Sequence, residues 1–146
     1  DTKIPLLRKF EKKADEILIG GALANNFFKT IGFEIGKSLV DDKASVTEFF
    51  NKENIKIPFD VVIKTGPKDL AELKKDDMIV DLGPNTSKEW IESIKSSKTI
   101  LLNGPLGFYE EGFDKASKEI LKAIADSGAF SVVGGGDTVK LINDLK

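Results

Sequence analysis

Apolar residues recur along the chain at two spacings, which predict alternating helices and strands. A spacing of three to four residues, as for Ile4, Leu7 and Phe10, is typical of a helix with one buried face. Short apolar runs bounded by glycine, proline or charge are typical of buried strands. The predicted helices are residues 5–15, 23–31, 41–54, 86–95, 115–126 and 138–145. The predicted strands are residues 16–19, 60–64, 78–82, 99–102 and 129–133.

The alternation of strands with helices predicts an α/β fold. Strands that are apolar almost throughout are buried on both faces, as in a parallel sheet. We therefore expect a three-layer, Rossmann-like parallel sheet with helices on both faces and with ligands at the carboxyl ends of the strands. Gly66-Pro67 predicts a loop between two strands, and residues 1–146 are expected to form a single domain.

Composition narrows the classes of partner and compartment. With 22 Lys plus Arg, 24 Asp plus Glu, a net charge of −2 and no clustered basic tract, the chain does not suit nucleic acid or an anionic membrane. It has no cysteine, no apolar run near the roughly 18 residues of a membrane span, and no signal-peptide pattern at its start. We expect a cytoplasmic protein.

Histidine is also absent, which excludes the Ser-His and Cys-His catalytic arrangements. Any chemistry must then use carboxylates, lysine, backbone amides or a metal ion.

The stretch Ser-Val-Val-Gly-Gly-Gly-Asp-Thr at residues 131–138 has the outline of a phosphate site. Glycines let backbone N–H groups approach an anion, the following helix points its positive end at it, and Asp137 can hold Mg²⁺ beside the phosphates. The alternative is a tight strand-to-helix turn capped by Asp137.

Two further strand ends carry glycine, at Gly20-Gly21 and at Asn103-Gly104-Pro105. In a parallel sheet these ends face one side, so together they predict a nucleotide site. Glu110 could accept hydrogen bonds from ribose hydroxyls, and Asn103 could donate towards a phosphate or a substrate group. The alternatives are a common Asn-Gly-Pro turn and a solvated acidic corner.

Two other motifs are weaker. Gly32 to Ser38 looks like a phosphate-binding P-loop, but it has three residues between its glycines where the motif needs four, and it follows a helix. The dinucleotide fingerprint Gly-x-Gly-x-x-Gly is absent at Gly20-Gly21, which disfavours an unrelated dinucleotide oxidoreductase. Lys3 could be a phosphate ligand or an ordinary exposed lysine.

Several segments together resemble phosphoglycerate kinase, specifically its carboxyl-terminal, nucleotide-binding domain. The resemblance extends over nearly the whole chain, and the order and spacing of the segments follow the family's. The segments are Asp1–Pro5, Ile19–Ala24, Phe33–Leu39, Ile57–Asp60, Asp81–Pro84, Asn103–Gly107 and Val133–Thr138.

The resemblance implies phosphoryl transfer between 1,3-bisphosphoglycerate and ADP, giving 3-phosphoglycerate and MgATP in glycolysis. It implies that Lys3, Thr138 and the amides of Gly135 and Gly136 hold and neutralise the phosphates, and that Asp137 coordinates Mg²⁺. The nucleotide-side roles that it implies are a ribose carboxylate at Glu110, an amide at Asn103, and adenine-slot walls at Gly20, Gly21, Ile79 and Gly107.

The family has two domains, whereas this chain holds about one. By this resemblance the amino-terminal domain that binds 3-phosphoglycerate is missing, so we expect a monomeric fragment that binds ADP or ATP without turnover. A stand-alone nucleotide-binding or regulatory module is the alternative. The resemblance also implies that Ala22 stands where the family has a glycine of the adenine slot, so that its methyl group weakens or shifts the packing of the base.

Overall fold

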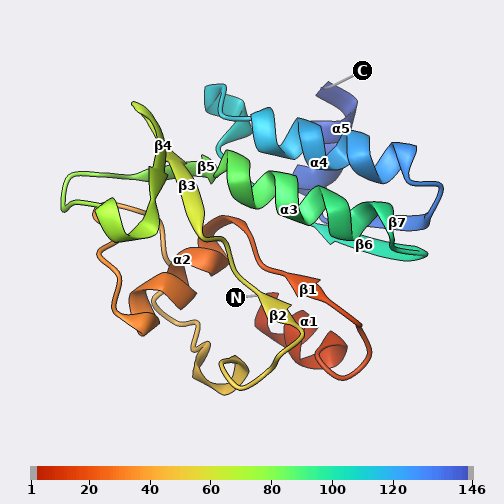
Figure 1. The fold of residues 1–146 in the computed structure, drawn as a ribbon, viewed down its shortest axis with the longest axis horizontal. Helices are drawn as coiled ribbons and strands as arrows, with labels where there is room; N and C mark the ends of the chain where they lie inside the picture. Colours follow the sequence, from red (N-terminus) through yellow and green to blue (C-terminus); the bar gives the residue numbers. More distant parts are fainter. Residues whose placement is uncertain (1–2, 145–146) are drawn as a thin grey trace.

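The structure, a computed structural model, describes residues 3–144, and strands and helices alternate along most of it (Figure 1). The α-helices are α1 (Lys3–Phe10), α2 (Gly21–Ile31), α3 (Pro84–Lys95), α4 (Lys115–Asp126) and α5 (Gly136–Asp144). The strands are β1 (Ile17–Leu18), β2 (Ile55–Lys56), β3 (Asp60–Ile63), β4 (Gly66–Asp69), β5 (Ile79–Leu82), β6 (Thr99–Asn103) and β7 (Phe130–Gly134). Three short 3₁₀ helices are η1 (Thr47–Phe49), η2 (Leu70–Glu72) and η3 (Tyr109–Glu111).

The strands pair in three groups. β1 pairs with β2 and β6 pairs with β7, both in parallel, whereas β3 lies between β4 and β5 and is antiparallel to each. The register of β6 and β7 runs from Thr99 opposite Phe130 to Asn103 opposite Gly134. The carboxyl ends of β6 and β7 are therefore level with each other.

Helices cover both faces of β1, which confirms the α/β, three-layer arrangement. Successive strand side chains point to opposite faces. Ile17 and Ile19 pack in a core with α1 and α2, whereas Leu18 between them packs in a second core with α3. In Figure 1, α3 and α4 lie side by side, on the opposite side of β1 from α1.

Two apolar clusters make the core. The first joins α1, α2, η1, η2 and the strands β3 and β5 around Phe27, Phe28 and Phe49. The second joins α3 and α4 around Trp90, Ile120 and Ile124, with Ile100 and Leu102 of β6 packed against it. On the opposite face of the β6–β7 pair, Leu101, Phe130 and Val132 are exposed.

The prediction of a helix over residues 41–54 is wrong. The structure has turns there, the short η1, and then strand β2, which the sequence did not reveal. Side chains of α2 explain the difference: the Asn26 amide donates to the carbonyls of Asp41 and Ala44 at 2.8 and 3.3 Å and accepts the Asp41 N–H. The carbonyls of Asp41 and Ala44, which a helix would pair internally, are thus bonded to a neighbouring helix.

The prediction of a parallel sheet is wrong for β3 and β5. β3 and β5 are the predicted strands 60–64 and 78–82, but they run antiparallel, and the predicted loop at Gly66-Pro67 is the start of β4. The turn Lys64-Thr65 allows β4 to fold directly back on β3, so this part is a hairpin with no helix between the strands. Helix α1 ends at Phe10 and not at 15, and the predicted last residue of the 138–145 helix lies outside the described part.

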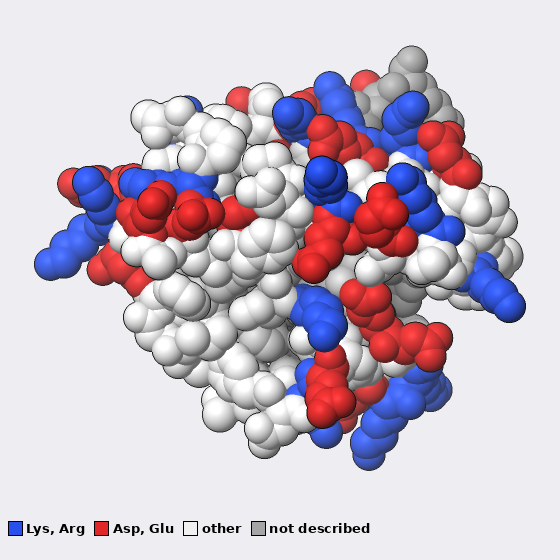
Figure 2. Space-filling view, in the orientation of Figure 1, with Lys and Arg blue, Asp and Glu red and all other residues white. Residues whose placement is uncertain are grey.

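Charges of both signs are interspersed on the face shown in Figure 2, over α3 and α4. Ion pairs along these helices and at the start of α4 include Lys95–Glu92, Lys118–Asp114 and Lys122–Asp126. Between residues 3 and 144, none of the helices combines the length and the apolar character that crossing a bilayer requires.

A buried carboxylate fixes the start of α3. Asp60, at the start of β3 and 2% exposed, accepts the N–H groups of Asn85 and Thr86 at 3.0 and 2.8 Å and the Thr86 hydroxyl at 2.5 Å. These donors belong to the first turn of α3, where no intrahelical acceptor exists. Pro84 at the first position supplies the backbone angle of a helix. Asp60 therefore ties α3 to the hairpin.

We predict that Asp60→Ala lowers the free energy of unfolding by about 2–3 kcal/mol, because it leaves three donors at the start of α3 without their acceptor. Urea denaturation measures the change. Asp76→Ala, which removes a carboxylate that is 93% exposed, is the control and should change stability by less than about 0.5 kcal/mol. Equal, small effects of both substitutions would contradict the capping role.

Candidate functional site

Three strand ends that carry glycine meet at one corner of the molecule. Gly20-Gly21 comes after β1, Asn103 ends β6 and is followed by residues 104–107, and Gly134 ends β7 and is followed by Gly135 and Gly136. A methyl group added at Gly21 would lie 3.4 Å from the Pro105 carbonyl, and one added at Gly20 would strike the Leu106 side chain. The segments after β1 and β6 are therefore in contact, and we call the whole arrangement the glycine corner.

A hydrogen bond joins the segments after β6 and β7. The Gly104 N–H donates to the Thr138 hydroxyl at 2.6 Å, and Thr138 is fully buried in the first turn of α5. Gly104 and Gly135 have backbone φ angles of +95° and +89°, which residues other than glycine rarely adopt. The corner thus needs glycine at these two turns.

Lys3 and Asn103 also lie at this corner. A methyl group added at Gly104 would be 2.7 Å from the Lys3 ammonium, so the start of α1 reaches the segment after β6. A methyl group added at Gly134 or Gly135 would lie 3.4 or 3.6 Å from the side-chain amide of Asn103. The structure therefore brings together a cation, an amide and glycine backbone from three separate parts of the sequence.

The segment after β6 is anchored beneath the corner. The Leu106 N–H donates to the Ser117 hydroxyl at 3.0 Å, and the Phe108 N–H donates to the Val80 carbonyl at 2.9 Å. Gly107 lies against β5, because a methyl group there would be 2.5 Å from the Asp81 carboxylate and 2.7 Å from the Val80 carbonyl. Gly107 thus allows this segment to pack directly on β5.

Asp81 is the buried carboxylate of this anchor. Its two oxygens accept the N–H groups of Leu82 and Ala116 at 2.8 and 3.2 Å, linking β5 to the first turn of α4. Burial raises the pKa of the Asp81 carboxyl to about 6. The two hydrogen bonds favour the charged form, and the nearby carboxylates of Asp114 and Glu119 oppose it.

The start of α5 combines exposed backbone with an exposed carboxylate. Gly135, Gly136 and Asp137 are exposed, and Asp137 lies in the first turn of the helix. Within residues 3–144 no three acidic, histidine or cysteine side chains gather in a group that could hold a metal by themselves. A single carboxylate fits Mg²⁺ that is held mainly by substrate phosphates and water.

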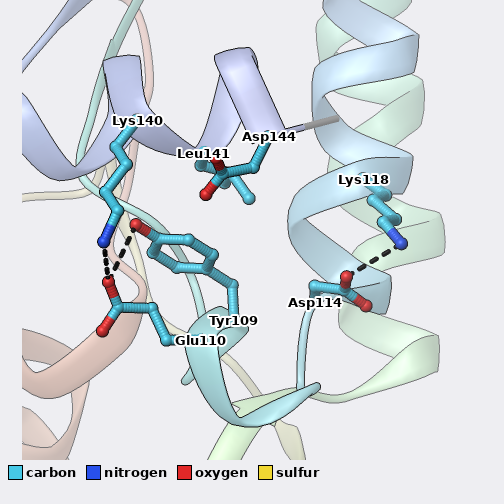
Figure 3. A pocket seen from close by; sticks show the side chains of 7 residues that line it. All are labelled: Tyr109, Glu110, Asp114, Lys118, Lys140, Leu141 and Asp144. Atoms are coloured by element: carbon cyan, nitrogen blue, oxygen red, sulfur yellow. Dashed lines mark hydrogen bonds and ion pairs between the residues drawn. The ribbon is translucent and has the colours of Figure 1, made fainter. Parts of the chain in front are cut away.

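Glu110 lies in η3, opposite α5. Its Oε1 accepts a hydrogen bond from the Lys140 ammonium at 2.5 Å, and the Tyr109 hydroxyl is 3.5 Å from the same oxygen (Figure 3). The hydrogen bond from Lys140 lowers the pKa of the Glu110 carboxyl, and the same bond raises the pKa of Lys140. These residues line an open hollow of about 550 Å³ between η3, α4 and α5.

Ile79 lies apart from the contacts that define the glycine corner. It is buried at the start of β5 among the residues of the first core, and its N–H donates to the Ser38 hydroxyl at 2.9 Å. The P-loop-like segment ends here: Gly32 closes α2, the Lys37 N–H donates to the Asp77 carbonyl, and Ser38 is buried. Residues 32–38 thus follow a helix, as the sequence indicated, and pack against the segment before β5.

The sequence did not reveal the partners Lys140, Asp81 and Ser117. All three act across 11 to 35 residues, in the pairs Lys140–Glu110, Asp81–Ala116 and Ser117–Leu106. No local motif marks such pairs. The one available signal was the buried, apolar setting of Asp81 in the run Ile79–Leu82, where an acid needs hydrogen-bond donors.

The fold and the corner define an α/β protein whose parallel strands end in glycine beside a lysine, an amide and a carboxylate. The phosphoglycerate kinase family model matches residues 1–146, and the chain belongs to that family.

Three relatives show how much of the family's length the chain spans. It is 39% identical to a phosphoglycerate kinase of Nitratidesulfovibrio vulgaris (strain DSM 19637 / Miyazaki F), over 97% of this chain and 40% of the relative. The structure of phosphoglycerate kinase from Coxiella burnetii matches with a TM-score of 0.87 and 31% identity, over 98% of this chain and 41% of that one. The phosphoglycerate kinase from Pyrococcus horikoshii OT3 matches with a TM-score of 0.74 and 29% identity, over 97% and 39%.

The pKa of Asp81 predicts a measurable pH dependence of stability. Because the folded-state pKa, about 6, lies above the unfolded value of about 3.9, the folded protein binds this proton more tightly. The contribution to stability is therefore largest below about pH 4 and falls as the pH rises to about 6. A ¹³C NMR titration should show the Asp81 carboxyl with a midpoint near 6, and Asp81→Asn should remove that signal. A midpoint near 4 would contradict the role of burial.

Proposed function

We propose that this chain is the nucleotide-binding part of a phosphoglycerate kinase, which transfers a phosphoryl group between 1,3-bisphosphoglycerate and MgADP to give 3-phosphoglycerate and MgATP. The observation that carries the proposal is the glycine corner, where Lys3, Asn103 and the start of α5 lie together. Membership of the family gives the reaction. The proposed setting is cytoplasmic glycolysis.

In this proposal the phosphates lie at the start of α5. The N–H groups of the exposed residues Gly135 and Gly136 donate to phosphate oxygens, and the helix presents its positive end to them. Lys3 lies beside Gly104 and offsets the negative charge that moves with the phosphoryl group. Thr138 is buried, so its hydroxyl supports the corner through Gly104, and a direct contact with phosphate remains a further prediction.

The nucleoside lies along the rest of the corner. Gly20 and Gly21 provide a flat wall for adenine beside Leu106, and Glu110 accepts hydrogen bonds from the ribose hydroxyls. Asn103 donates its amide to the phosphate side. Gly107 shapes the same wall by holding its segment on β5. Ile79, which lies in the first core, stays a predicted wall residue by the family resemblance alone.

Mg²⁺ fits this donor set and would be held by Asp137. When bound, it would neutralise phosphate charge and orient the phosphoryl group for in-line transfer. The residues of the chain would position the nucleotide and exclude water, which is the main part of catalysis in phosphoryl transfer. This chemistry needs no imidazole base, in agreement with a chain that has no histidine.

The chain spans about 40% of the length of the relatives reported above. We propose that the contacts to 3-phosphoglycerate come from the region outside this part. Because the chain spans only about 40% of these relatives, the second candidate function is a nucleotide-binding module without catalysis of its own. A titration with MgADP, paired with a coupled assay of ATP formation, separates the two.

We predict that Asp137→Asn weakens MgADP binding at least tenfold while changing metal-free ADP binding little, because the substitution removes the metal carboxylate and keeps the side chain's size. Isothermal titration calorimetry with and without Mg²⁺ measures both affinities. Asp126→Asn, at an exposed position at the end of α4, is the matched control. Equal losses with and without Mg²⁺ would exclude the metal role.

We also predict that the 146-residue chain alone binds MgADP but forms no ATP from 1,3-bisphosphoglycerate. Transfer requires both substrates to be aligned in a site closed to water, and one nucleotide-binding part does not supply that enclosure. The coupled assay should give a rate equal to its blank. Turnover that scales with the concentration of the chain and disappears in Asp137→Asn would refute the prediction.

A further inference from the structure

Lys140 forms a hydrogen bond with Glu110, and none of the roles proposed above accounts for it. It is exposed on α5, 30 residues from Glu110 in sequence, and it bonds the carboxylate that the proposed function assigns to ribose. Figure 3 shows Lys140 and the Tyr109 hydroxyl pointing at the same oxygen of Glu110, while the second carboxylate oxygen points away from both. The Glu110 side chain is 62% exposed, so a ligand in solution can reach its carboxylate.

We propose that Lys140 is a positioning residue for nucleotide binding, which holds the Glu110 carboxylate in place against α5 so that its second oxygen can accept from the ribose hydroxyls. This inference rests on the proposed function and adds to it a residue on α5. Without Lys140, an exposed glutamate would be free to adopt several rotamers, and each would have to be restricted when the nucleotide binds.

The position of Lys140 on α5 supports this role. It follows Asp137 by three residues, so the two side chains are neighbours on one face of the helix. The pair with Glu110 thus connects the proposed ribose carboxylate to the helix whose start is proposed to hold the phosphates. Any shift of α5 or η3 would disturb both subsites together.

Charge gives a second reason. A carboxylate near the phosphates of a nucleotide is repelled by them, and Asp137 adds a further negative charge that acts on Tyr109, the neighbour of Glu110. The Lys140 ammonium offsets this repulsion at the carboxylate itself. The lowered pKa of Glu110 and the raised pKa of Lys140 agree on the direction of that interaction.

The test compares two nucleotides that differ only in the ribose. MgADP has both hydroxyls, whereas the magnesium complex of 2′,3′-dideoxy-ADP has neither and cannot bond to Glu110. Lys140→Met should weaken MgADP binding roughly two- to fivefold, in keeping with an exposed ion pair, and should leave the dideoxy nucleotide unchanged. Lys140→Arg should restore most of the lost affinity, since it also donates to the carboxylate.

The matched control is Lys118→Met. Lys118 lines the same hollow, is about as exposed as Lys140 (52% against 58%), and pairs with Asp114 at 2.8 Å. It should change neither affinity. In a Glu110→Gln background, Lys140→Met should have no further effect on MgADP, because the two residues act through one another.

Each other result overturns the inference. Equal losses for both nucleotides would mean that Lys140 acts on the phosphates or on the fold, and tighter MgADP binding by Lys140→Met would mean that it competes with the ribose. Wild-type affinity that does not distinguish the two nucleotides would exclude the ribose role of Glu110 but keep nucleotide binding. Failure of the wild-type chain to bind either one would remove the proposed function itself.

Discussion

The hydrogen bond from the Gly104 N–H to the buried Thr138 hydroxyl is the constraint on which the corner depends. It joins the turn after β6 to the first turn of α5 at 2.6 Å, and both turns pass through backbone angles that need glycine. An exposed serine or threonine could not make this bond reliably, because water would compete for it. Burial of Thr138 makes the relative position of the two strand ends a property of the fold.

The level ends of β6 and β7 set up this bond, and the packing below maintains it. Parallel pairing places Asn103 opposite Gly134, so the two chains leave the sheet at the same height. Beneath them, the Asp81 carboxylate accepts a hydrogen bond from the first turn of α4. The Ser117 hydroxyl of that helix accepts one from the Leu106 N–H. Hydrogen bonds therefore connect strand β5 to helix α4, and helix α4 to the segment after β6. Gly107 is small enough to let that segment pack directly against β5.

The sequence predicted the parts of the fold that depend on local pattern. Helix α4 runs over the expected residues, and strands β6 and β7 lie within one residue of expectation, because their apolar residues repeat cleanly between clear breaks. The helix prediction for residues 41–54 was wrong for a physical reason. The apolar residues Val46 and Phe49 suit a helix, but the side chains of Asn25 and Asn26 on α2 hydrogen-bond the backbone carbonyls of Leu39, Asp41 and Ala44. The antiparallel hairpin was missed because period and length do not specify strand direction.

The same distinction applies to the site. Glycine and proline clusters are local, so the positions of the three turns could be predicted, and parallel strands made their convergence an expectation. The partners of the polar groups are not local. In the sequence, Glu110 is one of two adjacent acids that suit a solvated corner. Its hydrogen bond with Lys140 exists only because α5 packs close to it in the fold. A carboxylate's function depends on what faces it, and for Glu110 that is set by the packing of α5 against the η3 segment, which no pattern within either segment encodes.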